Sequence, residues 1–337
     1  GSGGGGGGGA FAPWSAVASS LRRDTLTMRA YKEGAEGEPP TSFLQRLKIK
    51  KNAKVIFVHA GTHAATFAAP IELKRQRARS PLTEKDLTSI FGKSALQFFN
   101  YFGPVAQRRL KAADVAVLLV SSRIRGFTLD GESHINPLGV CADRAELHIE
   151  QTFLRRDLHD QISSVLPSSC SVFHIEAGSA LADVAEGCRE PMAGLISITA
   201  HASFLYQMDR RALASGEPRP ALSYEGVIAR GYADWYHDLE KYLGIPSAYM
   251  PAVCAAIVEG GISERCIALV KKSARSFFTH LLADCAKRVP SQPPPVLYIR
   301  EPVRSVLELC ELPRFAPSVM ISRETLLDLA HYKVARA

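Results

Sequence analysis

The chain has 337 residues, 46% of them apolar and 22% charged, which is the composition of an ordinary globular protein and excludes a disordered or fibrous one. Its 41 Lys and Arg residues exceed its 33 Asp and Glu residues, so the net charge is +8. The longest apolar runs, 115–120 and 195–200, are far shorter than the roughly 20 residues of a membrane-spanning helix, so no membrane span is expected.

The positive charge is concentrated at the front of the chain. Residues 1–79 contain 13 basic and 5 acidic residues, whereas the rest of the chain is neutral. Two basic clusters, Arg46–Lys54 and Lys74–Arg79, flank the first predicted strand. A basic front on a neutral body predicts docking on nucleic acid or an acidic protein surface; a solvated tail is the alternative.

The seven cysteines are odd in number and include no C-x-x-C pair, which favours a reducing, intracellular compartment over a disulfide framework or zinc ribbon. Residues 10–30 are rich in Ala, Ser and Arg, as in an organelle transit peptide, so the expected location is cytoplasmic or mitochondrial. Residues 1–27 are compatible with a native leader, a transit peptide or a tag, although the glycine run before residue 10 is not typical of a transit peptide.

The glycine run at the start and the Pro- and Glu-rich stretch at 33–42 predict a flexible leader and linker over residues 1–42. Residues 43–337 are then expected to form a single α/β domain, with a helical insertion at about 203–260. No internal repeat is found.

In chain order, the first predicted strand is Val55–Val58, a run of large apolar residues that ends in small ones. A helical pattern starts at Thr83, and Gly92 and Gly103-Pro104 predict that it splits into two helices. Asp114–Ser122 is predicted to be the second strand, and a capping box near Asp143 predicts a helix that runs to Pro167.

Further strands are predicted at 171–177, 194–200, 296–299 and 318–322, with helices from Ser263, over 303–309 and from Glu324. Strands that alternate with helices predict parallel pairing, because parallel neighbours need crossover connections. The expected fold class is therefore α/β: a mostly parallel sheet of about five or six strands with helices on both faces, in a three-layer, Rossmann-like arrangement.

Polar, titratable residues follow several of the predicted strands, and in a doubly wound sheet such strand ends share one crevice that binds ligands. The candidate catalytic residues are His59, His63, Asp130, His174, Glu176 and His201. The candidate ligand-binding residues are Gly61, Thr62, Ser121, Arg123 and Arg125.

Three kinds of chemistry can use these residues. The histidines with Asp130 or Glu176 could bind a divalent metal that generates hydroxide. Ser121, Ser179 or Ser203 could act as a nucleophile with a histidine base. Alternatively, the backbone amides of residues 60–62, at the start of a helix, could bind a small anionic ligand together with Arg123 and Arg125.

No complete catalytic motif supports one of these mechanisms over the others: the nucleophile elbow, the phosphate loop and the dinucleotide fingerprint are all missing from the sequence. Residues 59–63 resemble the opening of the H-x-G-T-H-x-D-x-P-x-H signature of the cyclase and kynurenine-formamidase family. Ala65, Phe67 and Ala69 stand where that signature has Asp, Pro and His, so the chain is not assigned to the family.

Two functions are therefore expected in competition. One is an α/β enzyme, a hydrolase or transferase that acts on a small anionic or polar substrate at the strand ends. The other is a non-catalytic structural or assembly subunit of a ribonucleoprotein, an organellar complex or a capsid, which would dock through its basic front. Oligomerisation is compatible with either function.

Overall fold

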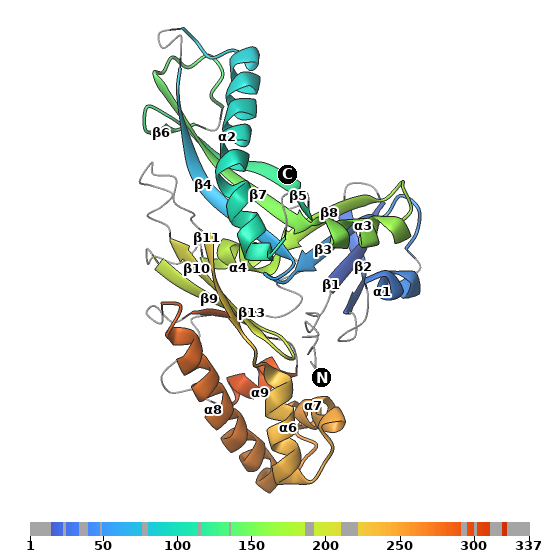
Figure 1. Ribbon diagram of the computed structural model, residues 1–337. Helices are drawn as coiled ribbons and strands as arrows, with labels where there is room; N and C mark the ends of the chain where they lie inside the picture. The colour runs from blue at the N-terminus through green and yellow to red at the C-terminus, as the bar shows by residue number, and fades with distance from the viewer. Residues whose placement is uncertain are drawn as a thin grey trace, which may run out of the picture.

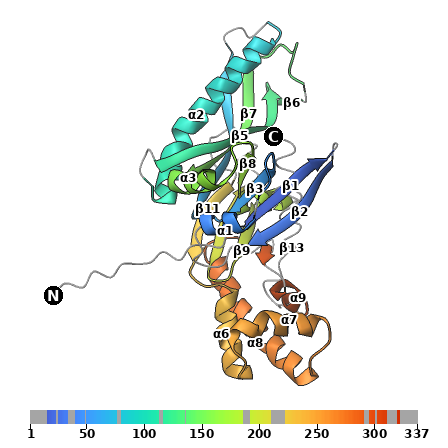
Figure 2. The ribbon, with the colours of Figure 1, turned by 90° about the vertical axis from the view of Figure 1, so that its right-hand side faces the viewer.

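The computed structural model describes residues 15–22, 25–33, 40–47, 49–75, 80–112, 116–134, 136–185, 192–209, 222–290, 295–299, 302–310 and 319–321. Figures 1 and 2 show the arrangement of these elements from two directions. Residues 15–22 and 25–33, within the predicted leader and linker, are described and form strands. The helix predicted from Glu324 lies outside the described residues. The predicted domain division stays a prediction.

The described strands form three sheets. The first has the order β2–β1–β3–β8, with strands β1 (Ser15–Arg22), β2 (Thr25–Glu33), β3 (Lys54–His59) and β8 (Ser171–Glu176). The second has the order β11–β10–β9–β12–β13, with strands β9 (Met192–Ile198), β10 (Ser203–Asp209), β11 (Leu222–Ile228), β12 (Val296–Ile299) and β13 (Val319–Ile321). The third has the order β4–β7–β5–β6, with strands β4 (Ala64–Lys74), β5 (Val117–Leu129), β6 (Glu132–Ser133) and β7 (Arg144–Arg155).

Strand β3 is buried on both of its faces, as its unbroken apolar run requires. On one face Val55 and Phe57 pack with helices α1 (Pro40–Leu47) and α3 (Arg156–Val165). On the other face Ile56 and Val58 pack against helix α4 (Ala177–Ala185) and the second sheet. The predicted first strand is therefore confirmed.

The far face of the second sheet is covered by a layer of helices, called the helical layer below, in the lower part of Figure 1. It contains α6 (Tyr232–Leu243), the short helix η2 (Ser247–Tyr249), α7 (Met250–Val258), α8 (Glu264–Ala286) and α9 (Val303–Glu308). Burial among these helices raises the pKa of the Cys254 and Cys285 thiols to about 12, so both stay protonated near neutral pH.

Helix α2 (Glu84–Leu110) lies along one face of the third sheet, as Figures 1 and 2 both show. A capping box at Thr83 begins the helix as predicted, but the helix continues through Pro104 and does not split in two. The buried residues Phe98, Phe102 and Ala106 lie at intervals of four on both sides of the proline. Their contacts with the sheet stabilise the helix where the proline removes a hydrogen bond.

The prediction of a mostly parallel, three-layer Rossmann-like sheet is wrong. Within the described part of the chain only β3–β8, β9–β12 and β12–β13 pair in parallel, and every other strand pair is antiparallel. The sequence pattern missed the strands that make these antiparallel pairs. Residues 64–74 were not predicted to form a strand, and residues 203–228 were not predicted to form two.

The helix predicted from Asp143 is also wrong over its first half. Residues 144–155 form β7, which is paired along its length with β4 on one side and β5 on the other. Leu147, Ile149 and Phe153 alternate onto the α2 side of the sheet, a period of two that is specific to a strand. Helical spacing begins only at α3, where Leu158 and Ile162 are buried.

No single helix among the described residues is long and apolar enough to cross a membrane. One bent pair, Tyr232–Leu243 with Ser247–Val258, passes that test by length and composition, with a bend of 112° between its halves.

Tyr206 of β10 is fully buried between the two glycines Gly61 and Gly178. A Cβ atom on Gly178, in α4, would lie 2.4 Å from the Tyr206 ring, and one on Gly61 would lie 2.7 Å from its hydroxyl. The second sheet can therefore approach the first only because both positions lack a side chain.

We expect Gly178→Ala to lower the free energy of unfolding by about 1–3 kcal/mol, because the added methyl group overlaps a buried aromatic ring. Gly92→Ala is the matched control: it is also a helical glycine, but its Cβ would meet nothing within 4 Å. This control should stabilise the protein by up to about 1 kcal/mol. Urea unfolding of both variants measures the difference, and equal effects would contradict the assigned contact.

Candidate functional site

The parallel pairing of β3 with β8 brings three of the predicted histidine and carboxylate positions together. His59 lies opposite Glu176 in the register, and Phe57 lies opposite His174. The ends of β3 and β8 therefore carry polar side chains, as the sequence predicts, and these side chains are buried. The surroundings of those groups decide what chemistry they can perform.

His59 and His174 form a buried stack under α3. Their ring nitrogens Nε2 and Nδ1 are 2.9 Å apart and share a hydrogen bond. The two rings stack at a centroid distance of 5.2 Å, with Phe57 on the same stack and His159 of α3 at 5.9 Å from His174. Such a stack keeps its imidazoles neutral. A charged ring there would lack the water that stabilises its charge, and it would repel a second charged imidazole beside it.

The pKa values of these histidines follow that environment. Burial, followed by the charges of His174 and His63, holds the pKa of His59 well below its usual value. Burial and His159 lower the pKa of His174 to about 3, and burial and Arg155 lower that of His63 to about 4. A general base that works near neutral pH needs a pKa closer to that pH.

Glu176, at the end of β8, is completely buried and forms an ion pair with Arg109 near the end of α2. Its second carboxylate oxygen accepts a hydrogen bond from the Thr66 amide of β4, at 2.5 Å. Burial raises the pKa of Glu176, and the Arg109 guanidinium and the Thr66 amide oppose that rise. This ion pair joins all three sheets, because two tyrosines of the second sheet surround it.

Those two tyrosines are Tyr206 of β10 and Tyr224 of β11. The Arg109 guanidinium lies 4.3 Å from the centre of the Tyr224 ring and 6.0 Å from that of Tyr206, within the range of cation–π attraction. Burial raises the pKa of both phenols. The cluster of Arg109, Glu176, Thr66, Tyr206 and Tyr224 is called the buried junction below.

Asp130 lies far from these groups. Its carboxylate accepts hydrogen bonds from the backbone amides of Asp143 and Arg144, where it caps the turn between β5 and β6. At the other end of β7, the backbone amide of Arg155 donates a hydrogen bond to the backbone carbonyl of His63. That strand is roughly 35–40 Å long at the usual rise, so Asp130 does not share a site with His63.

His201 is exposed in the turn between β9 and β10, beside the beginning of α6, whereas His59 and His174 are buried under α3. The turn after β3 also differs from the expectation: residues 60–62 lead into strand β4 and not into a helix. The predicted anion site on helical amides at Gly61 and Thr62 therefore lacks its helix. Gly61 is buried against Tyr206, and Thr62 is exposed.

Arg123 and Arg125, on β5, bind the buried carboxylate of Glu150 on β7, at 2.8 and 3.4 Å. Ser179 of α4 donates a hydrogen bond to the same carboxylate, at 3.1 Å. Ser121 is half-buried on the same face of the sheet. This arrangement fixes α4 to the third sheet, which is a structural use of residues predicted to bind a ligand.

Among the residues that the structure describes, no group of three or more His, Cys, Asp or Glu side chains is close enough to hold a metal ion. The predicted metal therefore has no ligand set there. The catalytic roles assigned to the strand-end residues stay predictions.

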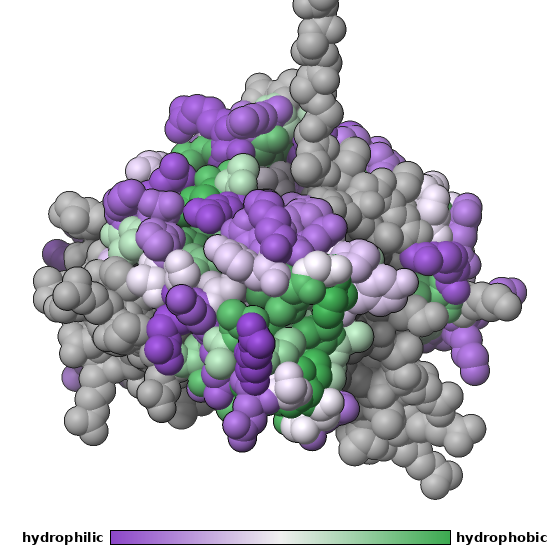
Figure 3. Space-filling view, turned by 90° about the horizontal axis from the view of Figure 1, so that it is seen from below, coloured by the Kyte–Doolittle hydropathy of each residue, from purple (hydrophilic) through white to green (hydrophobic). Residues whose placement is uncertain are grey.

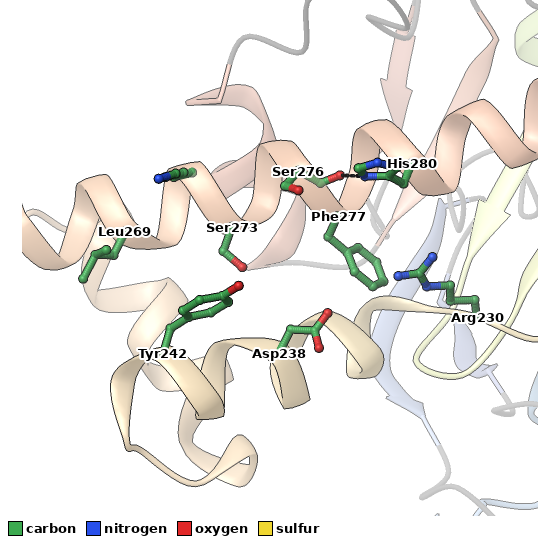
Figure 4. A pocket seen from close by; sticks show the side chains of 9 residues that line it. Arg230, Asp238, Tyr242, Leu269, Ser273, Ser276, Phe277 and His280 are labelled. Carbon is green, nitrogen blue, oxygen red and sulfur yellow. Dashed lines mark hydrogen bonds between the residues drawn. The ribbon is translucent and has the colours of Figure 1, made fainter.

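A pocket of about 290 Å³ opens elsewhere, between α6 and α8, and is shown in Figure 4. It is lined by Arg230, Asp238, Tyr242, Leu269, Lys272, Ser273, Ser276, Phe277 and His280. A second, shallower groove adjoins it along α8 and adds Lys271 and Arg275 to the same surface. Sequence analysis missed both, because the pattern marked α8 only by its buried stripe and not by its exposed basic residues.

The basic clusters at the front of the chain are described in part. Lys50 and Lys51 are exposed, and Lys54 lies 4.8 Å from the centre of the Phe173 ring. Arg75 donates hydrogen bonds to the backbone carbonyls of Ala142 and Ser80. Residues 76–79 lie outside the described residues, and docking through either cluster stays a prediction.

No protein-family model matches the chain, and no curated protein matches it. Solved structures with similarity include one entitled "PilM-PilN type IV pilus biogenesis complex", with a TM-score of 0.41 and 12% identity over 95% of this chain and 94% of that one. A Bacteroides thetaiotaomicron protein described as having an actin-like ATPase fold and unknown function has a TM-score of 0.37 and 8% identity, over 93% of this chain and 88% of that one. The archaeal actin homolog Ta0583 has a TM-score of 0.27 and 13% identity, over 54% of this chain and 67% of that one. At these scores and identities, the similarities establish no activity for this chain.

We expect acid to destabilise the protein through the buried histidines. Their folded pKa values lie below the unfolded value of about 6.5, so the unfolded state binds more protons below that pH. Their stabilisation is present above pH 6.5 and is lost as the pH falls towards 4 and 3. His174→Gln should flatten the slope of unfolding free energy between pH 6 and pH 4 by up to about 1.4 kcal/mol per pH unit. His237→Gln, at an exposed histidine, is the control; an unchanged slope in His174→Gln would refute the buried, neutral state.

We expect Arg109→Met to lower the free energy of unfolding by about 3–5 kcal/mol, because it leaves the buried Glu176 carboxylate without its partner. Adding Glu176→Gln should recover part of that loss, since the double variant buries no charge. Arg144→Met, which breaks the exposed pair with Glu72, should cost under about 1 kcal/mol. Denaturation of the wild type, of Arg109→Met and Glu176→Gln alone, and of the double variant forms the double-mutant cycle, with Arg144→Met as its control. Additive losses would show that Arg109 and Glu176 do not interact.

Proposed function

We propose that this chain is a binding subunit of a protein assembly, and that it docks a partner segment on its helical layer. The observation that carries this proposal is the exposed surface of the helical layer, which has apolar side chains on α7 and a row of basic ones on α8. The partner that this surface suits is a protein segment that presents apolar side chains together with carboxylates.

Helix α7 contains no charged residue, yet part of it faces solvent. Figure 3 shows apolar residues gathered in one patch on the face seen from below, where α7 lies. Pro251, Ala252 and Val258 are exposed, and Tyr249, directly before the helix, has more than 60% of its surface exposed. Contiguous exposed apolar surface of this kind is typical of a protein–protein contact. It is called the apolar patch below.

Lys271, Lys272 and Arg275 follow one another along α8 and are called the basic row below. They line the shallow groove, and none of them forms an ion pair with a carboxylate among the described residues. Arg275 donates to the backbone carbonyl of Cys310, which holds its side chain in place without neutralising its charge. The row is therefore a positive stripe, held in place at Arg275, that an acidic partner segment would neutralise.

Protein segments that are both apolar and acidic satisfy the two halves of this surface at once. The aromatic side chains Tyr242 and Tyr249 are of the type that is enriched at protein interfaces. A nucleic acid would satisfy the basic row but would leave the apolar patch of α7 exposed. The observations therefore favour a protein partner over a nucleic acid.

The histidines at the strand ends fit this proposal better than they fit a strand-end enzyme. His59 and His174 bond to each other and stack on Phe57, and their pKa values are depressed by burial. These are the properties of core side chains that stabilise the meeting of β3, β8 and α3.

The proposal is tested with a fluorescent synthetic helical peptide that carries leucines on one face and glutamates on the other. We expect saturable binding by fluorescence anisotropy, weakened at least about fivefold by Val258→Asp and by Lys271→Glu. Lys93→Glu, an exposed lysine of α2, makes the same charge change elsewhere and should leave the affinity within about twofold.

Two comparison probes decide between partners: the same peptide with lysine in place of glutamate, and single-stranded DNA. Equal binding of the lysine peptide would overturn the charge complementarity. DNA binding that is lost in Lys271→Glu but unchanged in Val258→Asp would replace the protein partner with a nucleic acid. No binding of the acidic peptide, or equal binding by all variants, would reject the helical layer as a docking surface.

A further inference from the structure

The pocket between α6 and α8 is lined by basic, hydroxyl and aromatic side chains, a combination that the docking of a protein segment does not by itself explain. Figure 4 shows Arg230, Tyr242 and Asp238 on one side of it, and Ser273, Ser276, Phe277 and His280 of α8 on the other. Its volume of about 290 Å³ is at the lower limit of small-molecule sites. It combines hydrogen-bond donors, positive charges and an aromatic wall.

The positive charge in the pocket is held in place. The Arg230 guanidinium lies 4.5 Å from the centre of the Phe277 ring, so the ring orients it. Its charge also contributes to lowering the pKa of Asp284, after Lys287. Lys272 lines the same pocket from α8 and has no carboxylate partner in the part of the chain described. The one carboxylate that lines the pocket, Asp238, is paired with Lys241 at 3.1 Å.

The hydroxyl groups in the pocket can donate hydrogen bonds. The Ser273 hydroxyl accepts a bond from the Trp235 indole at 3.2 Å, which leaves its own hydrogen to donate. Tyr242 and Ser276 supply two further hydroxyls. The His280 Nδ1 lies 2.7 Å from the Ser276 carbonyl oxygen and donates to it, which assigns the hydrogen of a neutral ring to Nδ1.

The rest of the wall is apolar: the rings of Phe277 and Tyr242 and the side chain of Leu269. A bare inorganic ion would use the donors but would leave these side chains in water. A flat apolar group that carries an oxyanion would contact both parts of the wall.

We propose that this pocket binds a small organic oxyanion, a phosphate or carboxylate group on a flat apolar body. Arg230 and Lys272 neutralise the anionic group, the Ser273 and Tyr242 hydroxyls donate to its oxygens, and Phe277 packs against the apolar body. The pocket shares Tyr242 and Lys272 with the surface proposed for docking, but no residue of α7 lines it. The proposal is argued from the pocket's own lining and does not rest on the proposed docking function.

The test uses phenyl phosphate as the probe, measured by isothermal titration calorimetry on the full chain. We expect saturable one-site binding, and weaker binding of inorganic phosphate and of phenol, because each of them lacks one half of the recognition. Arg230→Met keeps an apolar side chain against Phe277 and removes the charge, and it should weaken phenyl phosphate at least about tenfold. Lys272→Met, at an exposed position on α8, should weaken binding in the same direction.

Lys93→Met on α2 removes one positive charge far from the pocket and should leave the affinity within about twofold. Val258→Asp, which is expected to disrupt the docking of the acidic peptide, should also leave phenyl phosphate binding unchanged. Binding lost in Arg230→Met but retained in Val258→Asp supports the pocket whether or not the peptide binds. The proposal would be overturned if phenyl phosphate showed no saturable binding, or if Arg230→Met and Lys272→Met bound it as tightly as the wild type does. It would also be overturned if phenol bound as tightly as phenyl phosphate.

Discussion

The ion pair between Arg109 and Glu176 is the interaction on which the arrangement of the three sheets depends. Glu176 ends a strand of the first sheet, Arg109 belongs to the helix that covers the third sheet, and Tyr206 and Tyr224 come from the second. A completely buried carboxylate is tolerable only with a charged or hydrogen-bonded partner. The elements that supply those partners must therefore take fixed positions around it.

The buried junction also depends on the close approach of the Tyr206 side chain to the backbone at Gly61 and Gly178. Tyr206 occupies the space beside Gly61 and Gly178, and a side chain at either glycine would overlap it. The aromatic ring then shields the ion pair from water, which strengthens the attraction between Arg109 and Glu176. Burial of the charges and close packing of the tyrosine are thus two parts of the same contact.

Two sets of polar groups stand out among the described residues. Those at the junction, at Glu150 and in the histidine stack are buried and contact one another inside the protein, and they fix the positions of α4 and the three sheets. Those on α6 and α8 are accessible and include positive charges without carboxylate partners in the described part of the chain. Only the second set is placed to meet another molecule, which is why both proposals concern the helical layer.

Residue patterns within single segments were enough to predict the elements whose signal is local. These are strands β3, β8, β9 and β12, helix α8, and the capping box at Thr83, because each depends on residues near one another in the chain. The sequence also indicated that polar groups gather at the ends of β3 and β8. It did not reveal β4, β7 or the strand order, because Leu147, Ile149 and Phe153 form a strand only through pairing with segments far away in the sequence. Tertiary structure alone decided that His59 and His174 are buried against each other and that Arg109 meets Glu176, since burial and charge pairing between distant segments leave no periodic signal in a sequence.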